Sequence, residues 1–150
     1  TVVFPKTMKI SVLGDGLETC RERIGNELKS FYGISLENCD QAEDADILLG
    51  LDSCPAIKRL ISQRKLENEF DKIKYDGFAI SVSFGKILIA AREKRGVLYG
   101  VNAFLDLVKM TSGDTGPAKI CEVKVIDWPR SENRFFQHTI GSYYPSRFPV

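Results

Sequence analysis

The chain has 150 residues, the length of one ordinary domain, and a chain of this length can bury a hydrophobic core without disulfides or a metal ion. Its 21 basic and 20 acidic residues are interspersed and leave a formal net charge of +1, so it lacks a basic stripe that would attract nucleic acid or an anionic membrane. No apolar run reaches the roughly 18 residues of a membrane-spanning helix. Residues 1–9 lack the pattern of a signal peptide, although a removed export signal would leave the same sequence. We expect no nucleic-acid partner and no membrane span.

The spacing of cysteine and histidine argues against a metal site. Cys20, Cys39, Cys54 and Cys121 are far apart and His138 is the one histidine, so no cluster of zinc ligands is formed along the chain. A domain of this size does not need disulfides, and we expect free thiols. Cys20 falls on the apolar face of a predicted helix and Cys121 in a predicted strand, where cysteine packs as a small hydrophobe. We expect neither a metal nor another cofactor.

Strands and helices alternate in the first half of the chain. Residues 8–14 form a short apolar run that predicts a strand, and residues 15–33 carry apolar side chains at helical spacing. Asp15 with Glu18 resembles a capping box at the start of this helix, and Gly33 supplies its end. The elements predicted next are a weak strand over residues 33–37, a buried strand over 45–52 and a helix over 55–66.

The Gly14-Asp15-Gly16 segment joins the first strand to the first helix, and two interpretations are open. A glycine turn before a helix N-terminus can bind phosphate. However, the third glycine and the Lys-Ser/Thr pair of phosphate loops are missing, and the Asp15 carboxylate would repel phosphate. The sequence favours a tight turn followed by a helix cap.

A β-hairpin over residues 76–92 is the clearest local pattern in the second half. Apolar residues alternate with small or polar ones on both sides of a turn predicted at Gly85-Lys86, namely Phe78, Ile80, Val82 and Phe84 before it and Ile87 and Ile89 after it. The elements predicted after the hairpin are an amphipathic helix over residues 92–109, a loop over 112–117 and a final strand over 119–129.

Two glycines, Gly96 and Gly100, lie four residues apart in the helix over residues 92–109. Each costs about 1 kcal/mol of helix stability relative to alanine, so we expect a reason in the packing. Without a Cβ atom on this face, the helix backbone can approach the sheet closely. The element order β-α-β-β-α-β-β-α-β predicts an α+β domain with a mixed, largely antiparallel β-sheet and helices packed on it.

Carboxylates at strand ends are the residues that would carry catalysis if the chain were a small enzyme. Asp46, Asp52 and Asp127 lie at or near predicted strand ends, but charged residues in such places are usually solvated. His138 has no nucleophile or ligand partner nearby in the sequence, and we expect it in a mobile tail. Nothing in the sequence favours an enzyme built on these groups.

Aromatic residues offer surfaces that could stack on a sugar. Tyr99 lies inside the predicted helix and Trp128 at a strand end, so core packing with a polar tip is the preferred interpretation for both. After Pro129 the regular pattern stops, and the tail carries five aromatic residues, Phe135, Phe136, Tyr143, Tyr144 and Phe148. We expect these to cover an apolar contact with a neighbour.

The order of motifs in the second half resembles the N-terminal domain of family 20 glycoside hydrolases, the β-N-acetylhexosaminidases. Related domains precede the barrels of family 84 N-acetylglucosaminidases and family 67 glucuronidases. The similarity covers residues 8–135 and includes the apolar strand over 45–52. The matching residues are Gly77, Phe78, Ile80, Val82, Ile87, Ile89, Ala90, Ala91, Gly96, Tyr99, Gly100, Leu105, Leu107, Ile126, Asp127, Pro129 and Arg130.

The resemblance implies a hexosaminidase-like accessory domain without catalytic residues. In that family an adjacent Asp-Glu pair on a following (β/α)₈ barrel does the chemistry, and this chain contains neither the dipeptide nor the length of a barrel. It implies a domain over residues 1–130 and a truncated junction over 131–150, with the barrel of the same polypeptide as partner. Arg134 is the one candidate for the junction arginine that reaches the sugar, although Phe135 replaces the family's small residue. An exported parent would place the domain in a secreted or periplasmic compartment.

Three hypotheses about function follow. The leading one is a non-catalytic domain that supports a barrel not present in this chain, so the chain alone would lack glycosidase activity. The alternative is a stand-alone glycan- or protein-binding module whose tail aromatics make the contact. The third is a small enzyme that uses carboxylates such as Asp52 and Asp127. A reading frame that continues past Val150 into a barrel with an Asp-Glu pair would favour the first.

Overall fold

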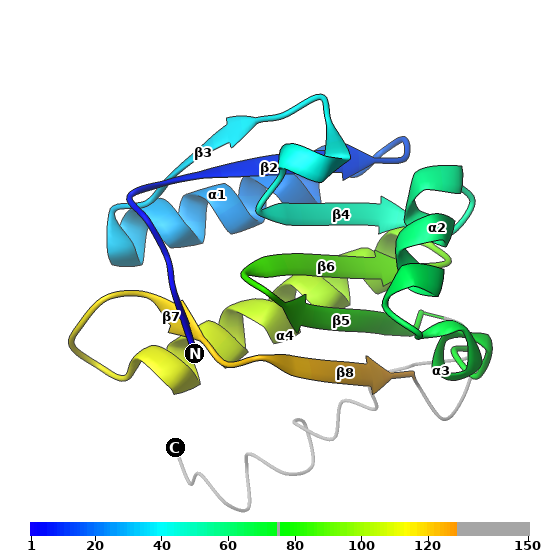
Figure 1. Cartoon of the computed structure of the whole chain (residues 1–150). Coiled ribbons are helices and arrows are strands. Elements are labelled where there is room, and N and C mark those ends of the chain that lie inside the picture. Colours follow the sequence, from blue (N-terminus) through cyan, green and yellow to red (C-terminus); the bar gives the residue numbers. More distant parts are fainter. Residues whose placement is uncertain (75, 129–150) are drawn as a thin grey trace, which may run out of the picture.

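The computed structural model describes residues 1–74 and 76–128 (Figure 1). The described elements are, in chain order, β1 (Val2–Val3), β2 (Thr7–Leu13), α1 (Glu18–Tyr32), β3 (Ser35–Asn38), the 3₁₀ turn η1 (Ala42–Asp44), β4 (Ile47–Leu51), α2 (Pro55–Gln63), α3 (Glu67–Asp71), β5 (Phe78–Ser83), β6 (Lys86–Ala91), α4 (Lys94–Ser112), β7 (Lys119–Ile120) and β8 (Val123–Asp127). None of the described helices is both long and apolar enough to cross a membrane.

Six of the strands form one mixed sheet in the order β3-β2-β4-β6-β5-β8. The pairs β2·β3, β2·β4 and β4·β6 are parallel, whereas β5 runs antiparallel to both β6 and β8. The short strands β1 and β7 form a separate antiparallel pair. The mixed sheet with its packed helices confirms the α+β prediction. Antiparallel pairing belongs to the hairpin half and to β1·β7, and the N-terminal half of the main sheet is parallel.

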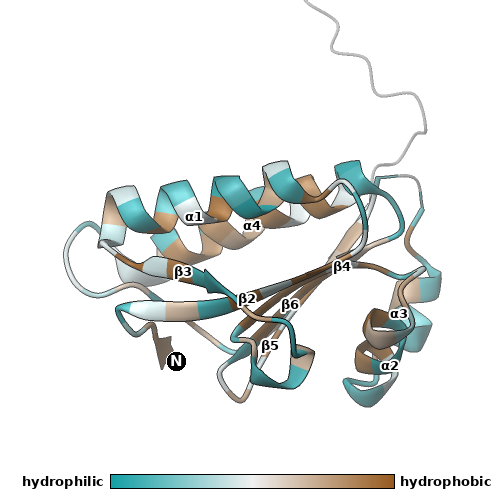
Figure 2. Cartoon of the chain, turned by 90° about the horizontal axis from the view of Figure 1, so that it is seen from above, coloured by the Kyte–Doolittle hydropathy of each residue, from teal (hydrophilic) through white to brown (hydrophobic). Residues whose placement is uncertain are grey.

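Helices cover both faces of this sheet. Figure 2 shows α1 and α4 side by side on one face and the shorter α2 and α3 on the other. The two faces bury separate clusters, because alternate residues of a strand point to opposite sides. In the central strand β4, Ile47 and Leu49 face α1 and α4, while Leu48 faces α2 and α3. A strand buried on both faces explains the continuous apolar run predicted for a central strand.

The close approach expected at Gly96 and Gly100 is confirmed. A Cβ atom built on Gly96 would lie 2.5 Å from the backbone oxygen of Gly77 and 2.8 Å from the Ala91 Cβ. On Gly100 it would lie 2.7 Å from Cγ2 of Ile89. The α4 backbone therefore rests directly on β5 and β6, and any side chain at these two positions would push the helix off the sheet.

The ends of α1 agree only in part with the sequence analysis. Its C-terminus is at Gly33, which has φ 68° and donates its N–H to Lys29, as a glycine stop should. At the N-terminus Leu17 occupies the cap position and no side chain caps the helix, so the Asp15/Glu18 capping box is wrong. Gly14 and Gly16 both have positive φ, and the predicted tight turn is present without the cap.

The final strand predicted over residues 119–129 is interrupted. Cys121 and Glu122 separate β7, which pairs with β1, from β8, which pairs with β5. Cys121 is exposed in this break and is not the packed small hydrophobe that an unbroken strand predicted, whereas Cys20 is buried as expected. Burial raises the pKa of the Cys20 thiol above its ordinary value. The four thiols are free.

The hairpin turn lies one residue earlier than predicted. Ser83 pairs with Lys86, so Phe84 and Gly85 are the two turn residues, with φ 49° and 76°. Positive φ at both central residues is the condition of a type I′ turn, which favours Asn, Asp or Gly at the first of them. Phe84 is therefore not a core residue of the alternating pattern. Its side chain is 92% exposed.

Candidate functional site

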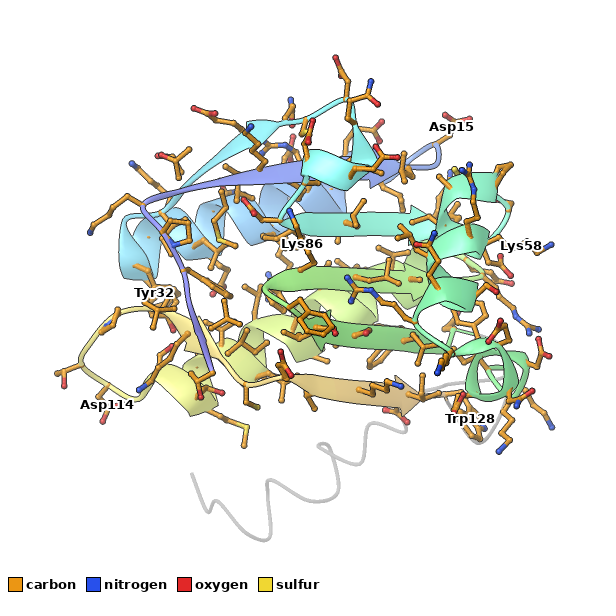
Figure 3. All side chains as sticks on the ribbon, viewed as in Figure 1. Asp15, Tyr32, Lys58, Lys86, Asp114 and Trp128 are labelled. Atoms are coloured by element: carbon orange, nitrogen blue, oxygen red, sulfur yellow. The ribbon has the colours of Figure 1, made fainter. Side chains whose placement is uncertain are left out.

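The edge of the sheet at which β2, β4, β6 and β8 end is the first place to look for a site, because parallel sheets bind ligands at the carboxyl ends of their strands. The described chain also ends here, at Trp128, after β8 (Figure 3). We call this region the exit edge and define it by Asp52, Asp76, Arg92, Arg95 and Trp128.

Two ion pairs occupy the exit edge. Nε of Arg92 lies 3.9 Å from the Asp52 carboxylate, and a terminal nitrogen of Arg92 donates a 3.2 Å hydrogen bond to the Phe70 carbonyl. The Arg92 guanidinium also lies 5.8 Å from the centre of the Phe70 ring. Arg95 is 3.4 Å from the carboxylate of Asp76, which is buried at the start of the hairpin. The edge is thus held by contacts between the segment before the hairpin, β4 and the start of α4.

Trp128 leaves the sheet over a glycine. A Cβ atom built on Gly77 would lie 2.7 Å from the Trp128 Cβ and 2.8 Å from the Asp127 carbonyl oxygen. Gly77 in turn presents its own carbonyl to Gly96 of α4, at the distance given above. Trp128, the last described residue, therefore packs against the Gly77 backbone, which itself lies against α4 at Gly96, and Trp128 is 37% exposed. This packing fixes the position of the last described residue.

The glycine turn at the same edge is filled by protein side chains. Carbon atoms of Leu51 lie 3.2 Å from a Cβ built on Gly14, and the Lys94 side chain lies against Gly16. Asp15 is exposed at the tip of the turn (Figure 3). Positive φ and close neighbours at both glycines agree with the preference for a structural turn.

The carboxylates proposed for a small enzyme are not brought together. Asp46 precedes β4 at the opposite edge, where it accepts a 2.9 Å hydrogen bond from the Lys9 backbone and lies 3.7 Å from Nζ of Lys86. Asp52 and Asp127 share the exit edge but belong to β4 and β8, three strand spacings or about 14 Å apart. Paired carboxylates of glycosidases lie about 5–10 Å apart. No group of three or more potential metal ligands occurs within residues 1–74 and 76–128.

Several residues singled out in the sequence lie outside the described residues, namely Arg134, His138 and the tail aromatics Phe135, Phe136, Tyr143, Tyr144 and Phe148. Tyr99 is partly buried and packs against the core beneath the sheet, in agreement with the preferred interpretation. Trp128 contacts Gly77 as described but is exposed, so core packing is wrong for this residue, because it lies beyond the last strand of the sheet. The proposed role of Arg134 as a sugar contact therefore stays a prediction.

A concave region that the sequence analysis missed lies at the hairpin end of the sheet, on the face that carries α2. It has a volume of about 400 Å³. We call it the hairpin hollow and define it by six of its lining residues, Arg64, Lys65, Ser81, Phe84, Lys86 and Lys124. The one sequence feature that could have indicated this region is Phe84, because a bulky residue is unusual beside Gly85 in a two-residue hairpin turn. The half-buried Arg64 left no local signal, because its partners are 17 and 22 residues away.

The fold and the exit edge define an α+β domain with a hydrophobic core on each face of its sheet and with Asp52 and Asp76 of its edge paired with arginines. The chain belongs to the family Glycosyl hydrolase family 20, domain 2, which it matches over residues 1–128. It has the place of an accessory domain of a glycoside hydrolase, as the sequence resemblance implied.

Solved structures with the same fold are enzymes much longer than this chain. The N-acetyl-β-hexosaminidase of Streptomyces plicatus superposes with a TM-score of 0.62 at 17% identity, over 85% of this chain and 23% of that one. The β-N-acetylhexosaminidase of Bacteroides fragilis gives 0.58 at 13%, over 86% and 22%. A family GH115 4-O-methyl-α-glucuronidase gives 0.64 at 16%, over 83% and 18%. The chain thus corresponds to about a fifth of each of these proteins.

Proposed function

We propose that this domain braces the (β/α)₈ barrel of a β-N-acetylhexosaminidase-type glycoside hydrolase, and that residues 131–150 form the junction between them. The observation that carries the proposal is the construction of the exit edge. The chain leaves over the Gly77 and Gly96 backbones, beside the Arg95–Asp76 ion pair. A fixed departure point transmits the orientation of one domain to the next, which a loosely attached terminus could not do.

The substrate class is proposed from the similar enzymes. Two of the three described above are hexosaminidases by name, which supports an N-acetylhexosaminide as the substrate of the whole protein. The catalytic Asp-Glu pair would then come from the barrel, and Arg134 at the junction would contact the sugar. We assign no catalytic residue to residues 1–128. The proposed partner is the barrel, with a glycan as a second ligand.

Activity measurements test this proposal directly. We expect the 150-residue chain to release nothing from an aryl N-acetylglucosaminide or an aryl glucuronide above the buffer rate. A polypeptide that continues into the barrel should hydrolyse the N-acetylglucosaminide. The same polypeptide without residues 1–128 should lose thermal stability. Turnover by the chain alone that disappears in Asp52→Asn would contradict the proposal and favour the small enzyme.

The boundary at residue 130 has its own test. Described residues build a core on each face of the sheet, so we expect deletion of residues 135–150 to leave the thermal midpoint of the domain unchanged. If the tail aromatics bind a neighbouring molecule, the same deletion should lower concentration-dependent association in sedimentation experiments. A deletion that unfolds the domain would show that the tail belongs to its core and would contradict the junction.

The stand-alone binding module is the second candidate, and the exposed Phe84 favours it. An aromatic ring that is 92% exposed at a hairpin tip can stack on a sugar. The two candidates differ in whether the barrel is needed. Retention of the isolated chain on a glycan, together with a reading frame that ends without a barrel, would support the module over the brace.

A further inference from the structure

The hairpin hollow lies far from the exit edge. Phe78 begins β5 opposite Asp127, where β8 ends, and Val82 near the end of β5 lies opposite Val123. The turn at Phe84 is therefore a full strand length, about 20 Å, from the point at which the chain leaves. Figure 1 shows the turn between β5 and β6 and the tip of β8 at opposite ends of the sheet. A contact with the following domain at the exit edge would leave the hollow open.

Three cations of the hollow have no carboxylate partner within the described part of the chain. Arg64 is half-buried, and one of its terminal nitrogens donates to the Ser81 carbonyl at 2.7 Å, the Ser81 hydroxyl at 3.0 Å and the Lys86 carbonyl at 3.3 Å. Burial lowers the pKa of this guanidinium from its ordinary value, because solvation of the charge is lost. Lys65 and Lys124 are exposed on either side.

The other charged groups around the hollow are engaged. Nζ of Lys86 donates to the Ala45 carbonyl at 2.9 Å and lies 3.7 Å from Asp46. The Glu122 carboxylate accepts a 3.2 Å hydrogen bond from the backbone N–H of Phe84 and so fixes the turn. Among the described residues the Glu122 carboxylate has no cation partner either, but its single negative charge is outweighed by Arg64, Lys65 and Lys124, so the net charge around the hollow is positive.

Backbone strain is concentrated in the same place. Lys65 and Phe84 are the two non-glycine residues with positive φ among those described, at 57° and 49°, and both line the hollow. Left-handed backbone costs a residue with a Cβ about 1–2 kcal/mol, and such strain is characteristic of functional positions. Lys65 takes the place that glycine usually has after a helix, and Phe84 takes the Asn or Gly place of the hairpin turn. At each position the backbone conformation favours glycine or asparagine, and the residue present instead has a long or aromatic side chain that can contact a ligand.

We propose that the hairpin hollow binds an acidic oligosaccharide, with the Phe84 ring against the apolar face of a pyranose and Arg64, Lys65 and Lys124 around its carboxylate or sulfate groups. The choice of a sugar as the ligand rests on the carbohydrate-active role proposed above. The positive charge and the strained Phe84 are observed in the structure and do not depend on that role. A single exposed ring and three cations match one or two acidic sugar units, whereas a nucleic acid requires a longer basic stripe than a chain of net charge +1 supplies.

An NMR titration of the 150-residue chain tests the proposal. We expect trigalacturonate to shift the amide signals of residues 62–66, 81–86 and 124, and a sulfated disaccharide to do the same if the hollow accepts both acids. The neutral trimer of N-acetylglucosamine should bind about tenfold more weakly, a difference of 1.4 kcal/mol. Raising the salt concentration should weaken the acidic sugars alone. Equal affinity for the neutral trimer, or a preference for a single-stranded oligonucleotide or an anionic phospholipid vesicle, would overturn the proposal.

Phe84→Asn separates binding from structure. The substitution creates the Asn-Gly dipeptide that a type I′ turn favours, so the thermal midpoint should rise while the affinity for trigalacturonate falls about tenfold. Phe31→Ala is the matched control, because Phe31 is also exposed but lies on α1 away from the hollow, with Nζ of Lys109 4.8 Å from its ring centre. An unchanged affinity in Phe84→Asn, or a lowered midpoint, would contradict a ligand-binding role for this ring.

The charge contribution has a matched control of its own. Lys65→Ala and Lys124→Ala should each weaken trigalacturonate binding several-fold, and the salt dependence should decrease in both. Lys58→Ala removes an exposed lysine from the outer side of α2 and should change nothing (Figure 3). If all three lose affinity equally, the attraction is general and the hollow is not the site. Phe84→Asn should not change how much the domain raises the thermal midpoint of a barrel attached to it. Failure of the ligand proposal can therefore be distinguished from failure of the proposed bracing role.

Discussion

At the exit edge, the arginines Arg92 and Arg95 face carboxylates, whereas in the hairpin hollow Arg64 faces backbone carbonyls and Lys65 faces solvent. The exit edge uses glycine where two backbones must touch, and the hollow uses Lys65 and Phe84 where glycine or asparagine would be relaxed. The first arrangement favours stability, and the second gives up stability for exposed groups. This difference is what we expect of a domain that is held at one end and binds at the other, as proposed above.

The largest effect should come from filling the glycine contact behind the exit edge. Gly96→Ala places a Cβ against the Gly77 carbonyl and should lower the free energy of unfolding by about 2–3 kcal/mol, despite the better helix propensity of alanine. Gly100→Val should cost about 1–3 kcal/mol for the same reason. Gly25→Ala in α1 meets the flexible Arg21 side chain at 3.2 Å and Leu36 at an ordinary contact distance of 3.8 Å, and should stabilise by about 0.5–1 kcal/mol. Urea denaturation of the three variants measures these values, and a stabilised Gly96→Ala would show that α4 does not rest on the sheet.

The strain in the hollow should be visible as a gain in stability. Lys65→Gly relieves a left-handed residue at the end of α2 and should raise the free energy of unfolding by about 1 kcal/mol. Gly33 has φ 68° at the end of α1 with open space around it, so Gly33→Ala should lose about 1 kcal/mol. The test is that the free energy of unfolding changes in opposite directions at two equivalent helix ends, and chemical denaturation of both variants measures it. A destabilised Lys65→Gly would mean that the lysine side chain supports the fold.

An ion pair of the exit edge should contribute a smaller amount. Asp76→Asn removes the partner of Arg95 and should lower the free energy of unfolding by about 0.5–1 kcal/mol, since the arginine is two-thirds exposed and solvent screens the pair. Added salt should reduce the difference between the variant and the parent. Asp114→Asn changes an exposed carboxylate in the loop before β7 and serves as the control (Figure 3). A salt-independent loss would assign the effect to packing instead of charge.

The smallest expected effect concerns pH near the hollow. The Ser62 hydroxyl donates a 2.6 Å hydrogen bond to Glu67 and lowers the pKa of that carboxyl. A lowered pKa in the folded state means that the stabilisation is present above the unfolded pKa and is lost as the pH falls through the folded one. Ser62→Ala should move the pKa of Glu67 up toward its ordinary value in an NMR titration and reduce the acid sensitivity of unfolding slightly. An unchanged titration curve would show that the hydrogen bond is not maintained in solution.

Local patterns were sufficient to predict most of the fold. The period of the apolar residues gave the strands and helices, and the unfavourable pair Gly96 and Gly100 indicated close packing because glycine in a helix needs a reason. The order of the second-half motifs indicated the family. Errors occurred where a long-range partner decides the outcome. The predicted strand over residues 119–129 is interrupted where its first part, β7, pairs with β1 instead of β5. This pairing is long-range and cannot be predicted from a local pattern.

The two regions differed in how far they could be predicted. At the exit edge Asp52 was singled out in the sequence and Asp76 was not, and the arginine partners of both are set by how the start of α4 meets β4 and the segment before β5. Phe84 was placed in the core because alternation continued through it, and only the register of Ser83 with Lys86 moves it into the turn. Arg64 is surrounded by residues from a hairpin far along the chain. The hollow therefore emerges only from the tertiary structure.

The pairing of β1 with β7 determines how the domain would carry a mechanical load. Val2 is anchored to Ile120 at the start of the segment that leads into β8, and Trp128 lies at its other end. Tension between these two points passes along the covalent backbone of residues 120–128, and the non-covalent contact that must carry it is the two-residue pairing of β1 with β7. While that short pair holds, the rest of the sheet is spared the load.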